Sequence, residues 1–416
     1  MIRRIDAALL LPMSSGPVPD ASVLIDDGTI AFAGPTADLP ANARPADTRV
    51  PVLMPGLWDA HCHLFGTPTF SLRDTLTTAP ATAAARAVKD LEAAINAGFT
   101  SVREAGGLGI WLAPVVDEGT VIGPAVYAAG GILSPTGGHG DQRDLPHEWV
   151  LDSCERNSAV RICDGVPECL RQVRLQLRAG ARIIKICTSG GASNPDTAGH
   201  RHFSTSELQA IVEEAGNAER AVMAHAHGKA GIMAALDAGV LTIEHGSGLD
   251  EESAAAMREQ GAIYVPTLTI VGYLLASRGD RKFREIAEKA AGAVAIAHRA
   301  GVTIASGSDL GSSGATSMAP WGTNGREPEL LRQAGLSAME ALAAATVHGP
   351  MTLGPQAPKS GAVRVGYDAD LIAPAADPTA DLGVLADPGR ITHVWKRGAL
   401  VKQPGSTQAP TASLIS

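Results

Sequence analysis

Short apolar segments alternate with helical segments through the middle of this 416-residue chain, and this alternation restricts the possible fold more than any other feature. Eight segments have the length and the apolar content of buried strands: VLMPGLWDAH, FTSVRE, AVYAAGG, ARIIKICTSG, AVMAHAH, LTIEHG, AIYVPTL and VTIASGSD. Strands that alternate with helices predict a parallel sheet, and eight is the number of strands that closes a (β/α)8 barrel. We therefore predict an α/β fold with a TIM-like (β/α)8 barrel.

Helix signals between these strands support the same topology. The expected helices include residues 81–98, 169–180 and 204–220. Ser204 and Glu207 have the spacing of a capping box, and Gly98 and Gly180 stand where a helix commonly ends. A doubly wound open sheet is the alternative, but no glycine-rich phosphate turn follows the first strand, so the barrel is favoured.

The two ends of the chain have a different pattern from the middle. SVLIDDGTIAFAG near the N-terminus contains two apolar runs around an Asp-Gly turn, which is typical of a hairpin. GAVRVGYDADLIAP and ITHVWKRGALV near the C-terminus have the same texture. Because an isolated hairpin is marginally stable, we expect residues 1–54 and 357–416 to form one small β-sandwich domain, with the barrel over residues 55–356.

Charge and cysteine content exclude several classes of protein. Asp and Glu outnumber Lys and Arg by 43 to 34, a net charge of −9, which argues against binding to nucleic acid or to an anionic membrane. No apolar stretch reaches the length of a membrane span, and Pro12 ends the short N-terminal apolar run too early for a secretion signal. The five cysteines lack paired spacing, so we expect a reducing compartment, the cytoplasm. We also expect a small-molecule substrate.

Histidines fall at the ends of several predicted strands, where a barrel builds its active site. The residues in question are His61, His63, His225, His227, His245 and Asp309. His61 and His63 are two apart in an extended strand and therefore face the same side, either as hydrogen-bonded core histidines or as metal ligands. With His225 and His245 they would supply four nitrogens suited to zinc or another divalent ion. Asp309 could cap a turn or supply the carboxylate that such a site lacks.

Lys185 stands between isoleucines in a predicted strand that is buried on both faces. A buried ammonium needs a partner, so a salt bridge to an acidic residue is one interpretation. The other is that carbon dioxide has converted the amine to a carbamate, which would supply oxygen ligands to metal ions. The sequence does not decide between them.

Seven motifs appear in an order that resembles the amidohydrolase superfamily. They are PGLWDAHCHLFG, the strand-four lysine with SGG beyond it, HAHG, IEHGSGLD, VPTL, GSD and GYDADLI. Together they are most similar to the amidase and dipeptidase branch, which includes imidazolonepropionase-like proteins, Xaa-Pro dipeptidases and ochratoxinase. The resemblance covers nearly the whole chain, including the split β domain.

The resemblance implies a centre of two divalent metal ions, which we expect to be zinc. His61, His63 and Asp309 would hold one ion and His225 and His245 the other, with carboxylated Lys185, formed from CO2, and a hydroxide as bridges. His227 would lie behind the ligands or contact the substrate. His139 matches a histidine that this branch places over the substrate carbonyl, although it could instead be a surface residue.

The implied mechanism is attack of the bridging hydroxide on an amide carbonyl, with Asp309 as general base and then general acid. Two features depart from the family pattern. Strand two has Arg103-Glu104 where the family shows Arg-Asp, and the loop after strand eight does not match the family pattern. Because of the second departure, the resemblance does not define the loop that sets substrate specificity.

The expected function is hydrolysis of a peptide-like amide with release of a C-terminal amino acid from a dipeptide or an N-acyl amino acid, ochratoxin-like amides included. Arg143 or Arg201 could bind the substrate carboxylate, or either could be a solvated surface residue. A carbamate, urea or cyclic amide hydrolase is the alternative. A deaminase is disfavoured because His225-Ala226-His227 lacks the His-x-Glu of that class, and a non-catalytic scaffold because every ligand is retained. The resemblance also implies a homo-oligomer.

Overall fold

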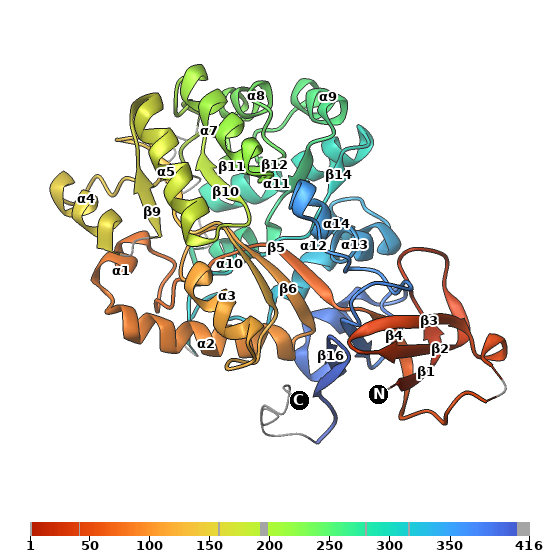
Figure 1. Ribbon diagram of the computed structural model, residues 1–416. Coiled ribbons are helices and arrows are strands. Elements are labelled where there is room, and N and C mark those ends of the chain that lie inside the picture. Colours follow the sequence, from red (N-terminus) through yellow and green to blue (C-terminus); the bar gives the residue numbers. More distant parts are fainter. Residues whose placement is uncertain are drawn as a thin grey trace.

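The computed structural model describes residues 2–40, 42–156, 159–191, 199–278, 281–314 and 317–405. Parallel strands form its centre, helices surround them, and a separate sheet lies at one side (Figure 1). The strands of the central unit are β5 (Leu57–Cys62), β6 (Phe99–Glu104), β7 (Ala125–Ala128), β8 (Ile132–Ser134), β9 (Val160–Ile162), β10 (Ile184–Cys187), β11 (Val222–Ala226), β12 (Thr242–His245), β13 (Ile263–Val265) and β14 (Thr303–Ile304).

Parallel pairing and a few backbone hydrogen bonds close these strands into a barrel. One sheet has the order β5-β6-β7, and the other has the order β14-β13-β12-β11-β10-β8-β9. Between β7 and β10, the Arg182 amide donates to the Ala128 carbonyl at 2.9 Å. Beyond β14, the Asp309 amide donates to the His61 carbonyl at 2.7 Å, which joins the last strand segment to the first. The predicted α/β barrel is confirmed.

The third barrel strand is broken, which the sequence did not predict. β7 pairs with β6, and the chain then turns at Gly130 before β8 pairs with β10. Gly130 has a φ of +78°, and a Cβ at this position would lie 2.3 Å from Oε1 of Gln176, the atom that accepts a hydrogen bond from the Gly131 amide. β9 adds a further parallel strand beside β8. β8 and β9 have three residues each, too few for an alternating pattern to be recognised.

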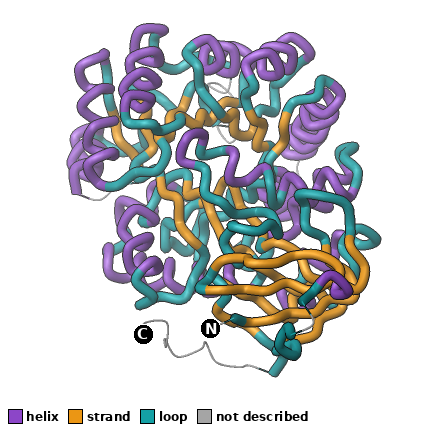
Figure 2. Tube along the Cα trace, turned by 45° about the vertical axis from the view of Figure 1, so that its right-hand side comes forward, coloured by secondary structure: helices purple, strands orange, loops and turns teal. Residues whose placement is uncertain are grey.

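Helices cover the outside of the strands, as Figure 2 shows in purple around orange. The α-helices are α1 (Leu72–Thr77), α2 (Pro80–Asn96), α3 (Gly109–Asp117), α4 (His147–Arg156), α5 (Gly165–Ala179), α7 (Thr205–Asn217), α8 (Lys229–Asp237), α9 (Glu251–Gln260), α10 (Leu268–Arg278), α11 (Arg281–Arg299), α12 (Glu327–Gln333), α13 (Ala338–Ala344) and α14 (His348–Met351). Short 3-10 turns are η1 (Thr36–Asp38), η2 (Asn324–Arg326), η3 (Gly354–Gln356), η4 (Leu382–Ala386) and η5 (Pro388–Arg390). In the part of the chain that is described, no helix is both long and apolar enough to cross a membrane.

Two of the predicted helix signals are present in the structure. Ser204 and Glu207 form the capping box at the start of α7, in which each side chain accepts from the other residue's backbone amide. Gly180 follows α5 with a φ of +99°, a left-handed conformation that glycine adopts without steric cost.

Both ends of the chain contribute to one seven-stranded sheet with the order β17-β16-β15-β4-β1-β2-β3. Its strands are β1 (Arg3–Leu10), β2 (Val18–Asp26), β3 (Thr29–Pro35), β4 (Thr48–Pro55), β15 (Leu371–Pro374), β16 (Ile391–Lys396) and β17 (Ala399–Lys402). The junction between the two chain ends is the antiparallel pairing of β4 with β15, in which Met54 faces Ile372. The small β domain from both ends is therefore present, while its exact limits at residues 54 and 357 stay predictions.

The expectation of a single strand over residues 52–61 is wrong. The chain leaves the small sheet at Pro55 and enters the barrel at Leu57. Gly56 lies between the two strands, and a Cβ there would lie 2.1 Å from Oγ1 of Thr100. The position where only glycine fits is thus the point at which the chain leaves the small sheet and enters the barrel.

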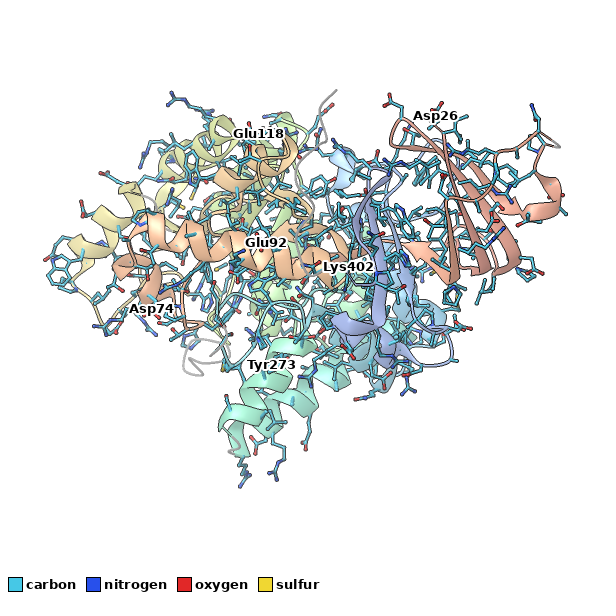
Figure 3. The ribbon with its side chains drawn as sticks, turned by 90° about the horizontal axis from the view of Figure 1, so that it is seen from below. Asp26, Asp74, Glu92, Glu118, Tyr273 and Lys402 are labelled. Carbon is cyan, nitrogen blue, oxygen red and sulfur yellow. The ribbon has the colours of Figure 1, made fainter. Side chains whose placement is uncertain are left out.

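The small sheet packs directly against the barrel. Met54 and Ile372 belong to the same buried apolar cluster as Leu91 of α2. At the surface, Nζ of Lys402 donates to the carbonyl of Asn96 at 2.6 Å, which joins β17 to the end of α2 (Figure 3). The start of β5, the strand that carries His61, therefore lies between the small sheet and α2.

Candidate metal centre

Two groups of side chains with metal-binding atoms lie at the C-terminal ends of the barrel strands. Within each group the potential ligand atoms lie within 4.8 Å of one another, and the groups are His61, His63 and Asp309, and His225, His227 and His245. The ring centres of His61 and His245 are 4.9 Å apart, so the two groups are contiguous. The structure thus brings together residues that are separated by up to about 250 positions in sequence, as a barrel mouth requires.

The first group is organised around Asp309. Its Oδ1 lies 3.2 Å from Nε2 of His63 and 3.6 Å from Nε2 of His61. The other ring nitrogen of each histidine is occupied, because Nδ1 of His61 lies 2.6 Å from Oε2 of Glu244 and Nδ1 of His63 lies 2.8 Å from the Gly106 carbonyl oxygen. Both Nε2 atoms therefore face the same carboxylate.

The second group is a cluster of three rings. The ring centre of His225 is 4.5 Å from that of His245 and 4.9 Å from that of His227. Nδ1 of His245 lies 2.8 Å from the Thr267 hydroxyl, and Nδ1 of His227 lies 2.9 Å from the Ser247 hydroxyl. By these distances His227 is placed like the two expected ligands, His225 and His245.

Lys185 projects from β10 into the same region and is only 2% exposed. Among the described residues, its Nζ has no hydrogen-bond partner, so no salt bridge to a described acidic residue is present. The nearby carboxylate, that of Glu244, is bound by Arg103 instead. Burial lowers the pKa of Lys185, which favours the neutral amine.

Burial also favours the neutral form of three of the histidines. It lowers the pKa values of His61, His225 and His245 well below the usual value, with neighbouring positive groups as a smaller cause. A neutral imidazole has a free lone pair, which is the state that binds a metal ion. Nε2 of His61 is buried and, like Nζ of Lys185, has no hydrogen-bond partner in the described part of the chain. Two unpartnered buried nitrogens beside a carboxylate and neutral imidazoles fit a metal centre.

The backbone at this mouth is strained. His245, Thr267 and Asp309 have φ values of +68°, +56° and +55°, a left-handed conformation that residues other than glycine seldom adopt. Such outliers persist where surrounding contacts fix them, and they gather at functional sites.

A cavity of about 990 Å³ opens above the two groups. Much of its wall is apolar, and the helices α10 and α11 contribute Ile270, Val271, Leu274, Ile286 and Ala290. Figure 3 shows this helical pair projecting from the barrel, with Tyr273 labelled on it. Tyr273 donates from its hydroxyl to Oγ1 of Thr323 at 2.8 Å, which ties the pair to the chain beyond β14.

His139 and Arg143 both line this cavity, on the loop that follows β8. The ring of His139 stacks on that of His225, with centres 4.1 Å apart. Arg201 is not among the described residues that line the cavity, and its guanidinium donates to the Phe203 carbonyl and to the Thr205 hydroxyl. Of the two expected arginines, the structure brings only Arg143 to the site.

Two cysteines near the ligands have different positions. Cys187, two residues after Lys185, lines the cavity. Cys62 lies between His61 and His63 in sequence, and its thiol contacts the Arg103 carbonyl at 3.8 Å. Burial raises the pKa of the Cys62 thiol well above its usual value, so it is a poor nucleophile.

Sequence reasoning missed the residues that support the ligands. Arg103 and Glu244 form a fully buried ion pair beneath His61. Asp59 accepts hydrogen bonds from the backbone of His61 and Ser308 and from the side chains of Ser308 and Asn324. The signal for the first pair was present, because each is a charged residue in an apolar strand, as Lys185 is. Asn324 carries no such signal, since it meets Asp59 only through the fold.

Comparison with known proteins agrees with this geometry. A model of the amidohydrolase family matches residues 52–401. Ochratoxinase from Aspergillus niger is 41% identical over 422 residues, which cover 96% of this chain and 86% of the relative. Its crystal structure has a TM-score of 0.90 at 40% identity and covers 97% of this chain and 96% of that one. The crystal structure of a prolidase complexed with N-methylphosphonate-L-proline has a TM-score of 0.85 at 33% identity, with 97% and 100% covered. That of a Xaa-Pro dipeptidase with bound methionine has a TM-score of 0.80 at 27% identity, with 97% and 100% covered.

Proposed function

This chain belongs to the amidohydrolase family and is a hydrolase, and from that premise we propose that it cleaves the amide bond of an N-acyl amino acid or a dipeptide and releases the C-terminal amino acid. The observation that carries the proposal is the convergence of two ligand groups, Lys185 and Arg143 on one cavity. The names of the relatives agree, since they include an ochratoxinase, a prolidase and a Xaa-Pro dipeptidase.

The proposed centre holds two divalent ions, with zinc as the expected metal. His61, His63 and Asp309 would hold one, and His225 and His245 the other. Lys185 would join them after its Nζ adds to CO2 and releases a proton, because the resulting carbamate offers two oxygen ligands. When bound, such ions lower the pKa of a coordinated water and polarise a carbonyl oxygen.

The chain's own residues supply the proton transfers and the orientation. Asp309 has a carboxylate at the junction of the two groups, where it can take a proton from the attacking water and deliver it to the leaving amine. His139 lies over His225 at the cavity, a position from which a ring nitrogen can donate to the substrate carbonyl. His227, whose Nδ1 contacts Ser247, would contact the substrate or support His225.

Arg143 is the proposed anchor for the substrate carboxylate. A net charge of −9 does not attract an anion from a distance, so the recognition must be local. Fixing one charged end of the substrate holds the scissile carbonyl near the metal ligands and makes the encounter a near-attack geometry. Hydrogen bonds between charged groups contribute about 1.5–3 kcal/mol each, which corresponds to roughly 10- to 100-fold in binding.

The test compares an N-acyl amino acid with its carboxamide on the zinc-loaded protein. We expect the carboxamide to lose roughly 10- to 100-fold in kcat/KM, because it cannot pair with a guanidinium. Arg143→Met should abolish this preference through a higher KM. Arg201→Met is the matched control, since it removes an arginine outside the cavity wall and should retain the preference.

Equal rates on the two substrates in the wild-type chain would contradict the dipeptidase-like function. Cleavage of carbamates, ureas or cyclic amides at higher rates would then favour the alternative, which the same ligand set could serve. Loss of the preference in Arg201→Met but not in Arg143→Met would move the anchor to Arg201.

A further inference from the structure

Four of the five histidines in the two ligand groups have a hydrogen-bond neighbour at Nδ1, and these neighbours differ in charge. His61 contacts the Glu244 carboxylate at 2.6 Å, and His63 contacts the Gly106 carbonyl at 2.8 Å. His245 and His227 contact neutral hydroxyls, those of Thr267 and Ser247, at 2.8 and 2.9 Å. Among these four, only His61 has a carboxylate within hydrogen-bond distance of Nδ1, since the Asp309 carboxylate lies 3.8 Å from Nδ1 of His245.

Glu244 forms an ion pair with Arg103. The Nη2 atom of Arg103 donates to Oε1 and to Oε2 of Glu244, both at 2.9 Å, and both side chains are fully buried. An arginine in a protein keeps its positive charge, so the carboxylate paired with it can only accept hydrogen bonds. The hydrogen shared with His61 therefore stands on Nδ1, which leaves the lone pair of His61 on Nε2.

Arg103 also fixes the backbone next to His61. Its Nε donates to the carbonyl of Ala60 at 2.5 Å, and its Nη1 donates to the Thr242 hydroxyl at 3.0 Å and to the Thr352 carbonyl at 3.3 Å. Every donor of the guanidinium thus has an acceptor. The pair is locked in place, and the ring of His61 can rotate only by breaking a bond to a buried carboxylate.

From this arrangement we infer that Glu244, locked by Arg103, is a positioning residue that orients Nε2 of His61 and makes the ion held by His61, His63 and Asp309 the more tightly bound of the two. The inference rests on the metal centre of the proposed function. A carboxylate behind a metal-binding histidine fixes its tautomer and raises its basicity, and the loss of such a partner typically costs 10- to 100-fold in metal affinity. In the other group, the described hydrogen-bond partners at Nδ1 of His227 and His245 are hydroxyls, and the Asp309 carboxylate lies 3.8 Å from Nδ1 of His245.

The experiment is an equilibrium titration of the zinc-loaded protein with a chelator, followed by the zinc that remains bound. The wild-type chain should release its ions in two steps. Glu244→Gln keeps the size of the side chain and removes its charge, so it should shift the tighter step by about 10- to 100-fold and leave the weaker step in place. His225→Ala should remove the weaker step alone, which assigns the two steps to the two groups.

Asp370→Asn is the matched control, because Asp370 is also a buried carboxylate paired with a cation, Lys396, and it accepts from the Arg397 amide in the small sheet. We expect it to lower Tm and to leave both release steps unchanged. If Glu244→Gln does not fold, the double variant Arg103→Met with Glu244→Gln leaves no unpaired charge and is measured in the same way.

The inference would be overturned if Glu244→Gln released zinc in the same two steps as the wild-type chain. An equal shift in Glu244→Gln and Asp370→Asn would also overturn it. A wild-type chain that takes up no zinc would overturn the proposed function itself. A chain that takes up two ions, with a tighter step that does not depend on Glu244, would overturn only the positioning role.

Discussion

Asp309 occupies the position in which one residue can serve both ligand groups. Oδ1 of its carboxylate faces Nε2 of His61 and of His63, and Oδ2 lies 3.8 Å from Nδ1 of His245. Its φ of +55° is held by the hydrogen bond from its amide to the His61 carbonyl. A strained backbone conformation at this residue is therefore maintained by the strand that carries the first two ligands.

We predict that Asp309→Asn lowers kcat by on the order of 10²–10⁴, because the amide keeps the size of the side chain but cannot accept a proton. The measurement is kcat on an N-acyl amino acid, with zinc content determined on the same samples. If kcat is unchanged while the metal is retained, the general base is another residue.

A charged residue inside an apolar strand was a useful signal for the site. We applied it to Lys185 but not to Arg103 and Glu244. The charge of Lys185 inside an apolar strand indicated a special environment, and the structure finds its Nζ buried and unpartnered. The same reasoning applied to Arg103 and Glu244 would have found the pair beneath His61. The contacts of Asp59 with Ser308 and Asn324 could not be predicted, because they depend on how distant segments meet.

At the scale of elements, each of the eight predicted strand segments contains an observed barrel strand, whereas β8 and β9 were not predicted. Residues 99–104 form β6 as expected, whereas β8 and β9 are too short for a periodic pattern. The division at Gly56 was also missed, since apolar residues continue on both sides of it. The contact with Thr100 that requires a glycine there is a property of the tertiary structure.

One buried carboxyl group, that of Asp90, anchors the loop after β14 to α2. The Ser313 hydroxyl donates to Oδ2 of Asp90 at 2.5 Å, and the Ser313 amide donates to the Thr67 carbonyl at 2.7 Å. Ser312, next to this anchor, lines the cavity. Burial raises the pKa of Asp90 from 3.8 to about 7, and the Ser313 hydrogen bond opposes this only in part.

The raised pKa predicts a pH-dependent stability. Between about pH 4 and pH 7 the folded chain retains a proton on Asp90 that the unfolded chain loses, so stability falls as the pH rises through this window. Asp90→Asn keeps an acceptor for Ser313 and does not ionise. We expect its Tm to match that of the wild-type chain near pH 4 and to exceed it above pH 7.

The measurement is Tm against pH for the wild-type chain, Asp90→Asn and Asp237→Asn, the last being an exposed aspartate at the end of α8. All three chains have the same histidines, so the differences between their curves isolate the substituted residue. Parallel curves for Asp90→Asn and the wild-type chain would show that Asp90 is ionised in the folded state throughout.

At the scale of the whole molecule, the sheet made from both chain ends packs against the barrel and holds its first strand. The pairing of β4 with β15 and the bond from Lys402 to the end of α2 fix the first barrel strand at its start. The ligands on that strand therefore depend on residues at both ends of the chain. The family resemblance is confirmed over residues 52–401, while the homo-oligomer and the cytoplasmic location stay predictions.

The most direct test of the account is the zinc content of the wild-type chain and of Lys185→Ala, measured by elemental analysis after identical loading and removal of free metal. The account predicts about two ions per wild-type chain, a lower content in Lys185→Ala with activity lost in parallel, and partial recovery of both on addition of a short carboxylic acid. Fewer than about one ion per wild-type chain, or wild-type content and activity in Lys185→Ala, would contradict it.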